Sequence, residues 1–272
     1  MTRTKRIGVF DSGFGGLDVL SGIVAELPEY SYVYLGDSAR VPYGPRSQKE
    51  IYSFTRQAVK YLFKHDCDLV ILACNSASSE ALHVIQREDI PANSSKRVLG
   101  VLIPSAEEAV IRTQKKRVGV IATEATVRSS AFTREVHKLN PGVEVYEQAC
   151  PFLVPLVERG LDRSIIAKAT VVGCLKPLGR YDIDTLILGC THYGILEPLI
   201  REVLGLSIAV VNQKNVVPRK LADYLVRHPD IEASLIQNGA RQFLSTKPSL
   251  QFDELGSRFF GSAIVAELAK LS

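Results

Sequence analysis

Two cysteines stand at the ends of two similar stretches of this 272-residue chain. Residues 68–76 read DLVILACNS and residues 184–192 read DTLILGCTH. A short apolar run rich in branched residues predicts a buried parallel strand. Cys74 and Cys190 would then lie at the carboxyl ends of two strands, where open α/β sheets bind their ligands. One thiol from each copy suggests two thiols that share a site, as needed to remove a proton from one face of a carbon and return it to the other.

The similarity between the two halves extends toward their beginnings. Residues 6–10 read RIGVF and residues 117–121 read RVGVI, and each would form the first strand of a half. The spacing between the copies is nearly the same at these strands and at the cysteines, which fits a duplication with small insertions. Chance similarity is the alternative, because buried strands draw on few residue types. The period is far too long for a solenoid, so we predict two similar lobes.

The composition is typical of a soluble globular protein, with 46% hydrophobic and 23% charged residues. A net charge of +4, carried by scattered basic residues, does not predict nucleic-acid binding. No apolar stretch approaches the roughly 20 residues that cross a bilayer. The first residues also lack the apolar core of a signal peptide. We therefore expect a cytoplasmic protein that does not bind a membrane.

The five cysteines are expected to be reduced, because their number is odd and no export signal is evident. Cys67, Cys150 and Cys174 are interpreted as incidental thiols or small apolar residues. No pair has the C-x-x-C spacing of a zinc or redox site. The sequence also lacks the phosphate-binding motif G-x-x-x-x-G-K-[ST] and a strand followed by a full G-x-G-x-x-G. We therefore expect neither a metal nor a cofactor.

Strands alternate with helices along the chain, which predicts an α/β fold with two pseudo-symmetric lobes, each a mostly parallel sheet flanked by helices. We expect residues 1–97 plus 211–272 to form a first, discontinuous lobe and residues 98–210 a second. The polar segment 89–97 is the predicted crossover between them. The predicted strands are 6–10, 31–35, 68–73, 98–102, 117–121, 143–147, 184–189 and 207–211. The predicted helices lie near 16–26, 47–65, 77–87, 105–112, 127–138, 152–158, 163–177, 195–203, 217–227, 231–245 and 253–270.

Two further loops have the composition of a ligand site. Residues 11–16 read DSGFGG after the first strand, where glycines allow a ligand to approach the backbone and the next helix offers free N–H groups. A plain turn is the alternative for this loop. Residues 36–46 contain two prolines and two glycines, which indicates a shaped loop that presents Tyr43.

The two cysteine loops carry groups that could tune a thiol. Only the thiolate is an effective base, and a helix N-terminus or a polar partner lowers the thiol pKa. Asn75 and Ser76 follow the first cysteine, and Thr191 and His192 follow the second. A nucleophile–His–acid triad is a competing interpretation, but it gives the second cysteine no role.

Four spaced motifs closely resemble those of the glutamate racemases: residues 7–13, 42–44, 73–77 and 189–193. The wider Asp/Glu racemase superfamily shares both cysteines, but aspartate racemases usually carry Glu where this chain has His192. The resemblance implies two lobes with the active site in the cleft between them. It also implies cofactor-independent racemisation of L-glutamate to D-glutamate, which supplies D-glutamate for peptidoglycan. A homodimer is expected from the resemblance alone.

The resemblance assigns roles residue by residue. Cys74 would act on the α-proton of D-glutamate with help from Asp11, and Cys190 on that of L-glutamate with help from His192. Glu158 matches a third acidic residue of the family's site. The implied substrate contacts are Asp11, Ser12, Tyr43, Gly44, Asn75, Ser76, Thr123, Thr126, Thr191 and His192.

The chain departs from the family pattern in the residues around the bases. Ser76 replaces the usual threonine, Ala125 a glycine, and Gly194 a proline, and Asn212 stands where an aspartate is usual. Both cysteines are intact. Two alternatives therefore stay open: a sister activity such as aspartate or hydantoin racemisation, and a weakly active binding or regulatory protein on the same fold.

Overall fold

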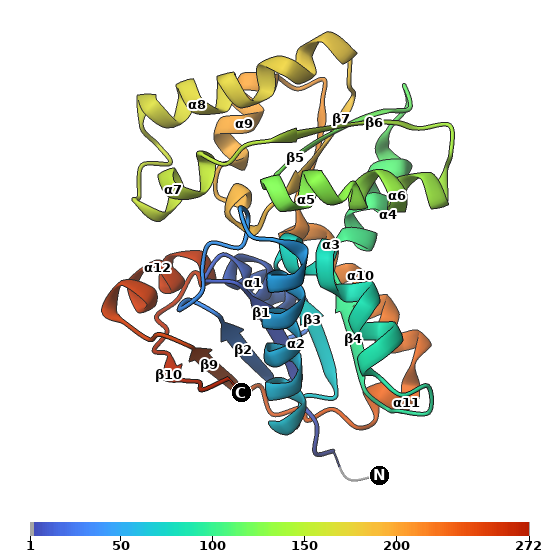
Figure 1. The fold of residues 1–272 in the computed structure, drawn as a ribbon, viewed down its shortest axis with the longest axis vertical. Coiled ribbons are helices and arrows are strands. Elements are labelled where there is room, and N and C mark those ends of the chain that lie inside the picture. Colours follow the sequence, from blue (N-terminus) through green and yellow to red (C-terminus); the bar gives the residue numbers. More distant parts are fainter. Residues whose placement is uncertain (1–2, 272) are drawn as a thin grey trace.

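Two parallel β-sheets, one in each lobe, form the framework of the computed structural model, which describes residues 3–271 (Figure 1). The first sheet has the strand order β10-β9-β2-β1-β3-β4, and the second has the order β6-β5-β7-β8. The first-sheet strands are β1 (Ile7–Asp11), β2 (Tyr32–Gly36), β3 (Leu69–Leu72), β4 (Arg97–Gly100), β9 (Arg241–Ser245) and β10 (Glu267–Leu268). The second-sheet strands are β5 (Arg117–Ala122), β6 (Glu144–Ala149), β7 (Thr185–Gly189) and β8 (Ala209–Val211).

The strand order supports the predicted duplication. The run β2-β1-β3-β4 in the first sheet has the same order as β6-β5-β7-β8 in the second. In this correspondence β1 matches β5 and β3 matches β7, which are the pairs of strands that resemble one another in sequence. Cys74 follows β3 and Cys190 follows β7, so the two thiols occupy equivalent positions in the two lobes. The predicted fold class is confirmed.

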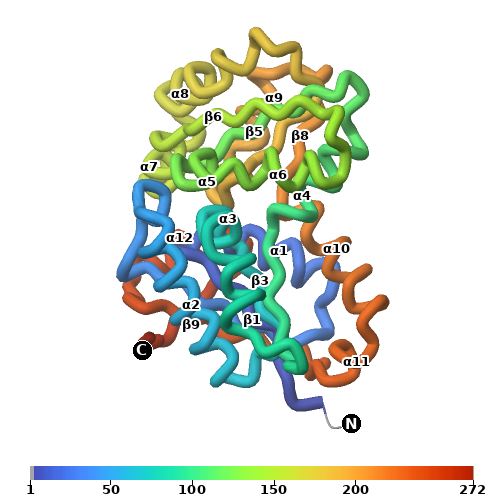
Figure 2. Tube along the Cα trace, turned by 45° about the vertical axis from the view of Figure 1, so that its right-hand side comes forward, coloured from blue at the N-terminus to red at the C-terminus, as the bar shows by residue number. Residues whose placement is uncertain are grey.

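Helices cover the sheets in both lobes, as the two views show (Figures 1 and 2). Every residue of β1, β2, β3 and β7 is buried, because helices remove both faces of these strands from water. The first-lobe helices include α1 (Gly16–Glu26), α2 (Gln48–Lys64), α3 (Asn75–Val84), α10 (Gln213–Arg227), α11 (Pro229–Glu232) and α12 (Leu250–Phe260). The others are α4 (Leu102–Arg112), α5 (Glu124–Ser129), α6 (Ala131–Leu139), α7 (Leu153–Glu158), α8 (Ile165–Leu175) and α9 (Glu197–Leu204).

The predicted helix over residues 231–245 is wrong. The short helix α11 ends at Glu232, and β9 then pairs in parallel with β2 of the first sheet. A strand near the sheet edge carries polar residues such as Arg241 and Gln242, so its sequence lacks the apolar run that marks the inner strands. The last predicted helix is also shorter, ending at Phe260 before β10. The C-terminal segment adds β9 to the first sheet beside β2 (Figure 1).

The predicted crossover at residues 89–97 is also wrong. That segment leads into β4, which pairs with β3 in the first sheet. The chain instead passes between the lobes after β4 and returns after β8, where α10 begins and packs against α1. We propose that the lobes divide at these two points, three residues later than the boundary expected after residue 97.

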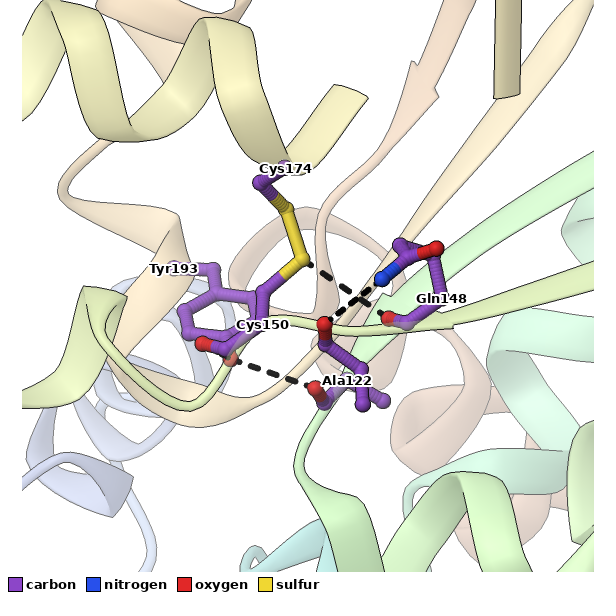
Figure 3. Close-up of a disulfide and its surroundings, with 6 residues drawn as sticks. Ala122, Gln148, Cys150, Cys174 and Tyr193 are labelled. Carbon is purple, nitrogen blue, oxygen red and sulfur yellow. Dashed lines mark hydrogen bonds between the residues drawn. A yellow bond between two sulfur atoms is a disulfide. The ribbon is translucent and has the colours of Figure 1, made fainter. Parts of the chain in front are cut away.

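One disulfide joins Cys150 and Cys174, which corrects the expectation that both are reduced thiols. The bond ties the connection between β6 and α7 to helix α8 (Figure 3). Tyr193 lies beside it, and its hydroxyl donates to the carbonyl oxygens of Cys150, at 2.8 Å, and Ala122, at 3.3 Å. The two cysteines are 24 residues apart in sequence, and only the fold brings their Cα atoms to 5.7 Å. Cys67, Cys74 and Cys190 are free.

Across residues 3–271, no helix combines the length and the apolar character needed to cross a membrane.

Candidate active site

Both repeat cysteines line one cavity of about 40 Å³. Its walls come from both lobes: Cys74 follows β3 of the first sheet and Cys190 follows β7 of the second. The cavity is lined by Ser12, Val41, Pro42, Tyr43, Gly44, Cys74, Asn75, Ser76, Thr123, Val154, Cys190, Thr191 and His192. A larger hollow of about 150 Å³ beside α4 and α10 contains no thiol, so it is not where two-base chemistry could occur.

Three of the predicted site residues do not line this cavity. Asp11 and Thr126 are fully buried behind its wall, and Glu158 lies next to His192, which does line the cavity. Val41, Pro42 and Val154 line the cavity although we did not predict them as site residues. Pro42 belongs to a motif that carried the family resemblance, whereas Val154 gave no signal in the sequence.

The environment of Cys74 favours the neutral thiol. Cys74 is the N-cap residue of α3, and its Sγ donates to Ser12 Oγ at 3.4 Å. Burial, together with the negative charge of Asp11, raises the pKa of Cys74 to about 12. Burial also raises the pKa of Asp11, although that carboxylate accepts from Gly13 N at 2.9 Å and from Thr191 Oγ1 at 3.3 Å. At neutral pH, Cys74 therefore carries a proton that it can donate.

The environment of Cys190 contains a positive charge instead. Its Sγ lies 3.9 Å from His192 Nδ1. The other ring nitrogen, Nε2, lies 3.2 Å from Glu158 Oε1, close enough for an ion pair but not aligned as a hydrogen bond. Burial opposes protonation of His192, but the contacts with Cys190 and Glu158 outweigh it and raise the pKa to about 10. The imidazolium therefore persists at neutral pH and can balance a thiolate on Cys190.

The Tyr43 loop is held by a buried carboxylate that we did not single out from the sequence. Asp37 is fully buried, and its Oδ2 accepts from Tyr43 Oη at 2.5 Å and from Arg40 Nε at 2.7 Å. Its Oδ1 accepts from Thr246 Oγ1 at 2.9 Å. Burial and the Asp37 charge raise the pKa of Tyr43, so the phenol stays neutral and keeps donating. Asp37 thereby connects the cavity wall to the C-terminal segment.

Several contacts cross from one lobe to the other around the cavity. Ser76 Oγ lies 2.8 Å from Thr123 Oγ1, which lies 3.0 Å from Thr126 Oγ1. The amide N–H of Ala125 donates to Gly44 O at 2.9 Å. These bonds align hydroxyl groups of both lobes at the cavity.

The glycine-rich turn of residues 11–16 approaches the second cysteine loop so closely that only glycine fits at position 15. A Cβ on Gly15 would lie 2.5 Å from Thr191 Oγ1 and 2.6 Å from His192 Nδ1. No side chain fits there without displacing the groups next to Cys190. The imidazole also packs between Phe14 and Phe259, with ring centroids 5.5 Å and 5.4 Å away.

Two of the departures from the family pattern are neighbours in space, because a Cβ on Gly194 would lie 3.4 Å from Asn212 Nδ2. A Cβ on Gly194 would lie 2.4 Å from Asp18 Oδ2, so glycine suits this position better than a proline. Asn212 Nδ2 donates to Glu197 Oε2 at 2.6 Å, a bond that an aspartate could not make while ionised. Ser76 keeps the hydroxyl of the usual threonine, and Ala125 is accommodated in the buried first turn of α5.

Within residues 3–271, no group of three or more His, Cys, Asp or Glu side chains is placed to hold a metal ion.

Comparisons with known proteins agree over nearly the whole chain. Residues 7–213 match the model of the family described as Asp/Glu/Hydantoin racemase. The chain is 38% identical to a glutamate racemase of Geobacter metallireducens, over 96% of this chain and 94% of that protein. It is 43% identical to one of Ruegeria pomeroyi, over 89% and 92%.

Solved structures give the same result. The fold superposes on a glutamate racemase isoform of Bacillus anthracis with a TM-score of 0.91 at 34% identity, covering 99% of both chains. For a glutamate racemase of Francisella tularensis in complex with D-glutamate, the TM-score is 0.89 at 29% identity, covering 100% of this chain and 99% of that one. With two thiols at equivalent strand ends of a duplicated fold, the chain belongs to the Asp/Glu/hydantoin racemase family.

Proposed function

We propose that this protein is a glutamate racemase that interconverts L- and D-glutamate by two-base proton transfer. The observation that carries the proposal is the pair of thiols, one from each lobe, on a single buried cavity. The two enantiomers have equal free energy, so the enzyme must serve both directions, with one base for each face of the α-carbon. Two thiols at equivalent positions of a duplicated fold meet that requirement.

The charge state of the site selects which thiol begins each reaction. With Cys190 as thiolate and Cys74 as thiol, Cys190 takes the α-proton of L-glutamate and leaves the electron pair on the α-carbon. Cys74 then donates its proton to the opposite face, which yields D-glutamate, a Cys74 thiolate and a Cys190 thiol. The reverse reaction starts from that second state. The high pKa of Cys74 favours its thiol form, and the His192 imidazolium lies beside Cys190.

The difficult step is removal of a weakly acidic α-proton. In a buried cavity, fixed dipoles and hydrogen-bond donors stabilise developing negative charge more strongly than water does. The hydroxyls of Ser12, Ser76 and Thr123 and the N-terminus of α3 supply such donors around the cavity. A volume of about 40 Å³ has room for only a few water molecules, fewer atoms than glutamate contains. Entry of the substrate therefore requires the lobes or the Tyr43 loop to part and close again.

Circular dichroism of the dialysed protein tests the proposal. We expect the signals of both L-glutamate and D-glutamate to decay to zero without added pyridoxal phosphate, while D-aspartate stays unchanged. Decay of aspartate in place of glutamate would instead assign a sister activity. No decay with either would leave the binding-protein alternative and refute the racemase.

We propose that its product serves peptidoglycan synthesis in the cytoplasm. Free thiols at Cys74 and Cys190 support a reducing location, because the reaction consumes neither thiol but requires both. The disulfide between Cys150 and Cys174 supports the opposite, because such bonds are rare in the cytosol. Labelling of free thiols in protein prepared from cells, before and after reduction, tests the location and the state of that bond.

We also propose that the protein forms a homodimer through an exposed apolar surface made by α8 and by Phe152, which precedes α7. Ile165 is 85% exposed and Phe152 is 74% exposed, and Ile166 and Val172 extend this face along α8. Exposed apolar surface of this kind marks sites of protein–protein contact. Light scattering after size exclusion should give the mass of a dimer, and Ile165→Lys combined with Ile166→Lys should give a monomer. A wild-type monomer would refute this proposal.

A further inference from the structure

Gln213 is a buried side chain whose only hydrogen-bonding partner among residues 3–271 is Asn75, a residue of the cavity wall. Asn75 Nδ2 donates to Gln213 Oε1 at 2.9 Å, and Gln213 Nε2 donates to Asn75 Oδ1 at 2.7 Å. Asn75 is 2% exposed and Gln213 is 3% exposed. Gln213 itself does not line the cavity, whereas Asn75 does.

This reciprocal pair holds the Asn75 amide in a fixed plane. A primary amide has two N–H donors and one oxygen with two lone pairs. Pairing with Gln213 uses one donor and one lone pair, and leaves the second N–H and the second lone pair of Asn75. If the Asn75 amide alone turned over, its NH₂ would face the NH₂ of Gln213 and its oxygen would face the other oxygen. Gln213 therefore holds the plane of the Asn75 amide, with the remaining donor and lone pair directed away from Gln213.

The pair also lies at the point where the chain returns from the second lobe. Asn75 and Gln213 are the first residues of α3 and α10, and Gln213 follows β8 of the second sheet by two residues. The next residue, Lys214, forms an ion pair at 2.8 Å with Asp18 of α1. The returning crossover is thus bound to two first-lobe elements that follow site strands.

We propose that Gln213 is a positioning residue for racemisation, which orients Asn75 so that its free N–H donates to a carboxylate of the substrate. This inference rests on the proposed function. It assigns Gln213 no direct contact with the substrate, so its effect passes entirely through Asn75. Loss of Gln213 should then weaken substrate binding more than it slows proton transfer.

A double-mutant cycle tests this path. Gln213→Ala should raise KM for glutamate by about 10- to 100-fold with a smaller change in kcat, because a binding group loses its orientation. In an Asn75→Ala background the same substitution should change KM by less than about twofold, because residues that act through one contact are not additive. Gln237→Ala, at an exposed glutamine of the same lobe, is the matched control and should leave KM unchanged. Thermal unfolding identifies any variant that fails to fold.

A second variant, Gln213→Glu, keeps the test valid if the alanine variant does not fold. While its carboxyl group is protonated, that group can donate its O–H to Asn75 Oδ1 and accept from Asn75 Nδ2, as the glutamine amide does. Once ionised, the carboxylate can only accept. Burial raises the pKa of a carboxyl group at this position above its ordinary value of about 4.3, so the KM of this variant relative to wild type should fall toward one as the pH is lowered from about 8 to about 5.

The outcomes separate the inference from the proposed function. Additive losses in the double variant, or a relative KM of Gln213→Glu that does not respond to pH, would overturn the positioning role in an active racemase. Absence of turnover by the wild-type protein would refute the proposed function itself, and the inference with it.

Discussion

Replacing Glu158 with glutamine tests the electrostatic part of the proposed mechanism. The substitution keeps the shape of the side chain and removes its charge, which lies 3.2 Å from His192 Nε2. Without that charge, the imidazolium beside Cys190 should lose its proton at a lower pH. The state with a thiolate at Cys190 and a thiol at Cys74 then becomes harder to form.

The structure sets the size of the effect. Two unit charges 3.2 Å apart attract by about 5 kcal/mol at an effective dielectric constant of about 20. The Glu158 side chain is 32% exposed, however, so water screens much of this attraction. About 1–3 kcal/mol should remain, and one pKa unit corresponds to about 1.4 kcal/mol. We therefore expect the pKa of His192 to fall by about 1–2 units from its value of about 10.

The assay is the pH dependence of kcat/KM, measured by circular dichroism from both enantiomers. Activity that needs the imidazolium is lost as the pH rises through its pKa, so the alkaline limb should move about 1–2 units lower in Glu158→Gln. Equal free energies of the enantiomers require equal kcat/KM in both directions, so both data sets must move together. The substrate amino group also titrates in alkaline solution. The test is therefore the difference between the alkaline limbs of the variant and the wild type, not the pH at which either limb lies.

A matched control separates the local charge from the net charge. Glu202→Gln removes the same charge from an exposed ion pair with Lys168 in the second lobe and should leave the limb in place. An unchanged limb in Glu158→Gln would refute the proposed coupling between Glu158 and His192.

The free energy of unfolding should also depend on the charge of His192. Because the pKa of His192 lies above its ordinary 6.5, the charge stabilises the fold fully below about pH 6.5, and this contribution is lost as the pH rises through about 10.

Three further perturbations follow from the site. Cys74→Ser and Cys190→Ser should each lower kcat/KM for inversion by about 10²–10⁴-fold, measured by circular dichroism; near wild-type inversion in either variant would contradict the two-base mechanism. Asp37→Ala leaves three donors without their buried acceptor and should lower the free energy of unfolding by about 3–5 kcal/mol in urea titrations, and a loss below about 1 kcal/mol would show that this network does little for stability. Gly15→Ala should reduce activity because its Cβ would overlap the imidazole near Cys190, whereas Gly173→Ala, with open space around it, should not; equal activities would show that the turn can shift at no cost.

Parts of the fold could be predicted because they depend on neighbouring residues in the sequence. The strands that lead to Cys74 and Cys190 are buried on both faces, so they read as continuous apolar runs. Their repetition predicted two equivalent lobes, which the strand orders bear out. The residues of β9 were predicted as part of a helix. Their polar sequence lacks the apolar run of an inner strand, and it does not indicate that they pair with β2.

The sequence by itself determined the two thiols, the strands that present them and the duplicated α/β architecture, because burial and strand formation leave a local pattern in the residues. Only the tertiary structure decided which distant side chains meet. The disulfide, the hydrogen bond from the Tyr43 hydroxyl to Asp37 and the pairing of Asn75 with Gln213, 138 residues apart, all belong to this second class. Such contacts leave no local pattern, because they form only after the strands have aligned the loops and helix ends that carry them.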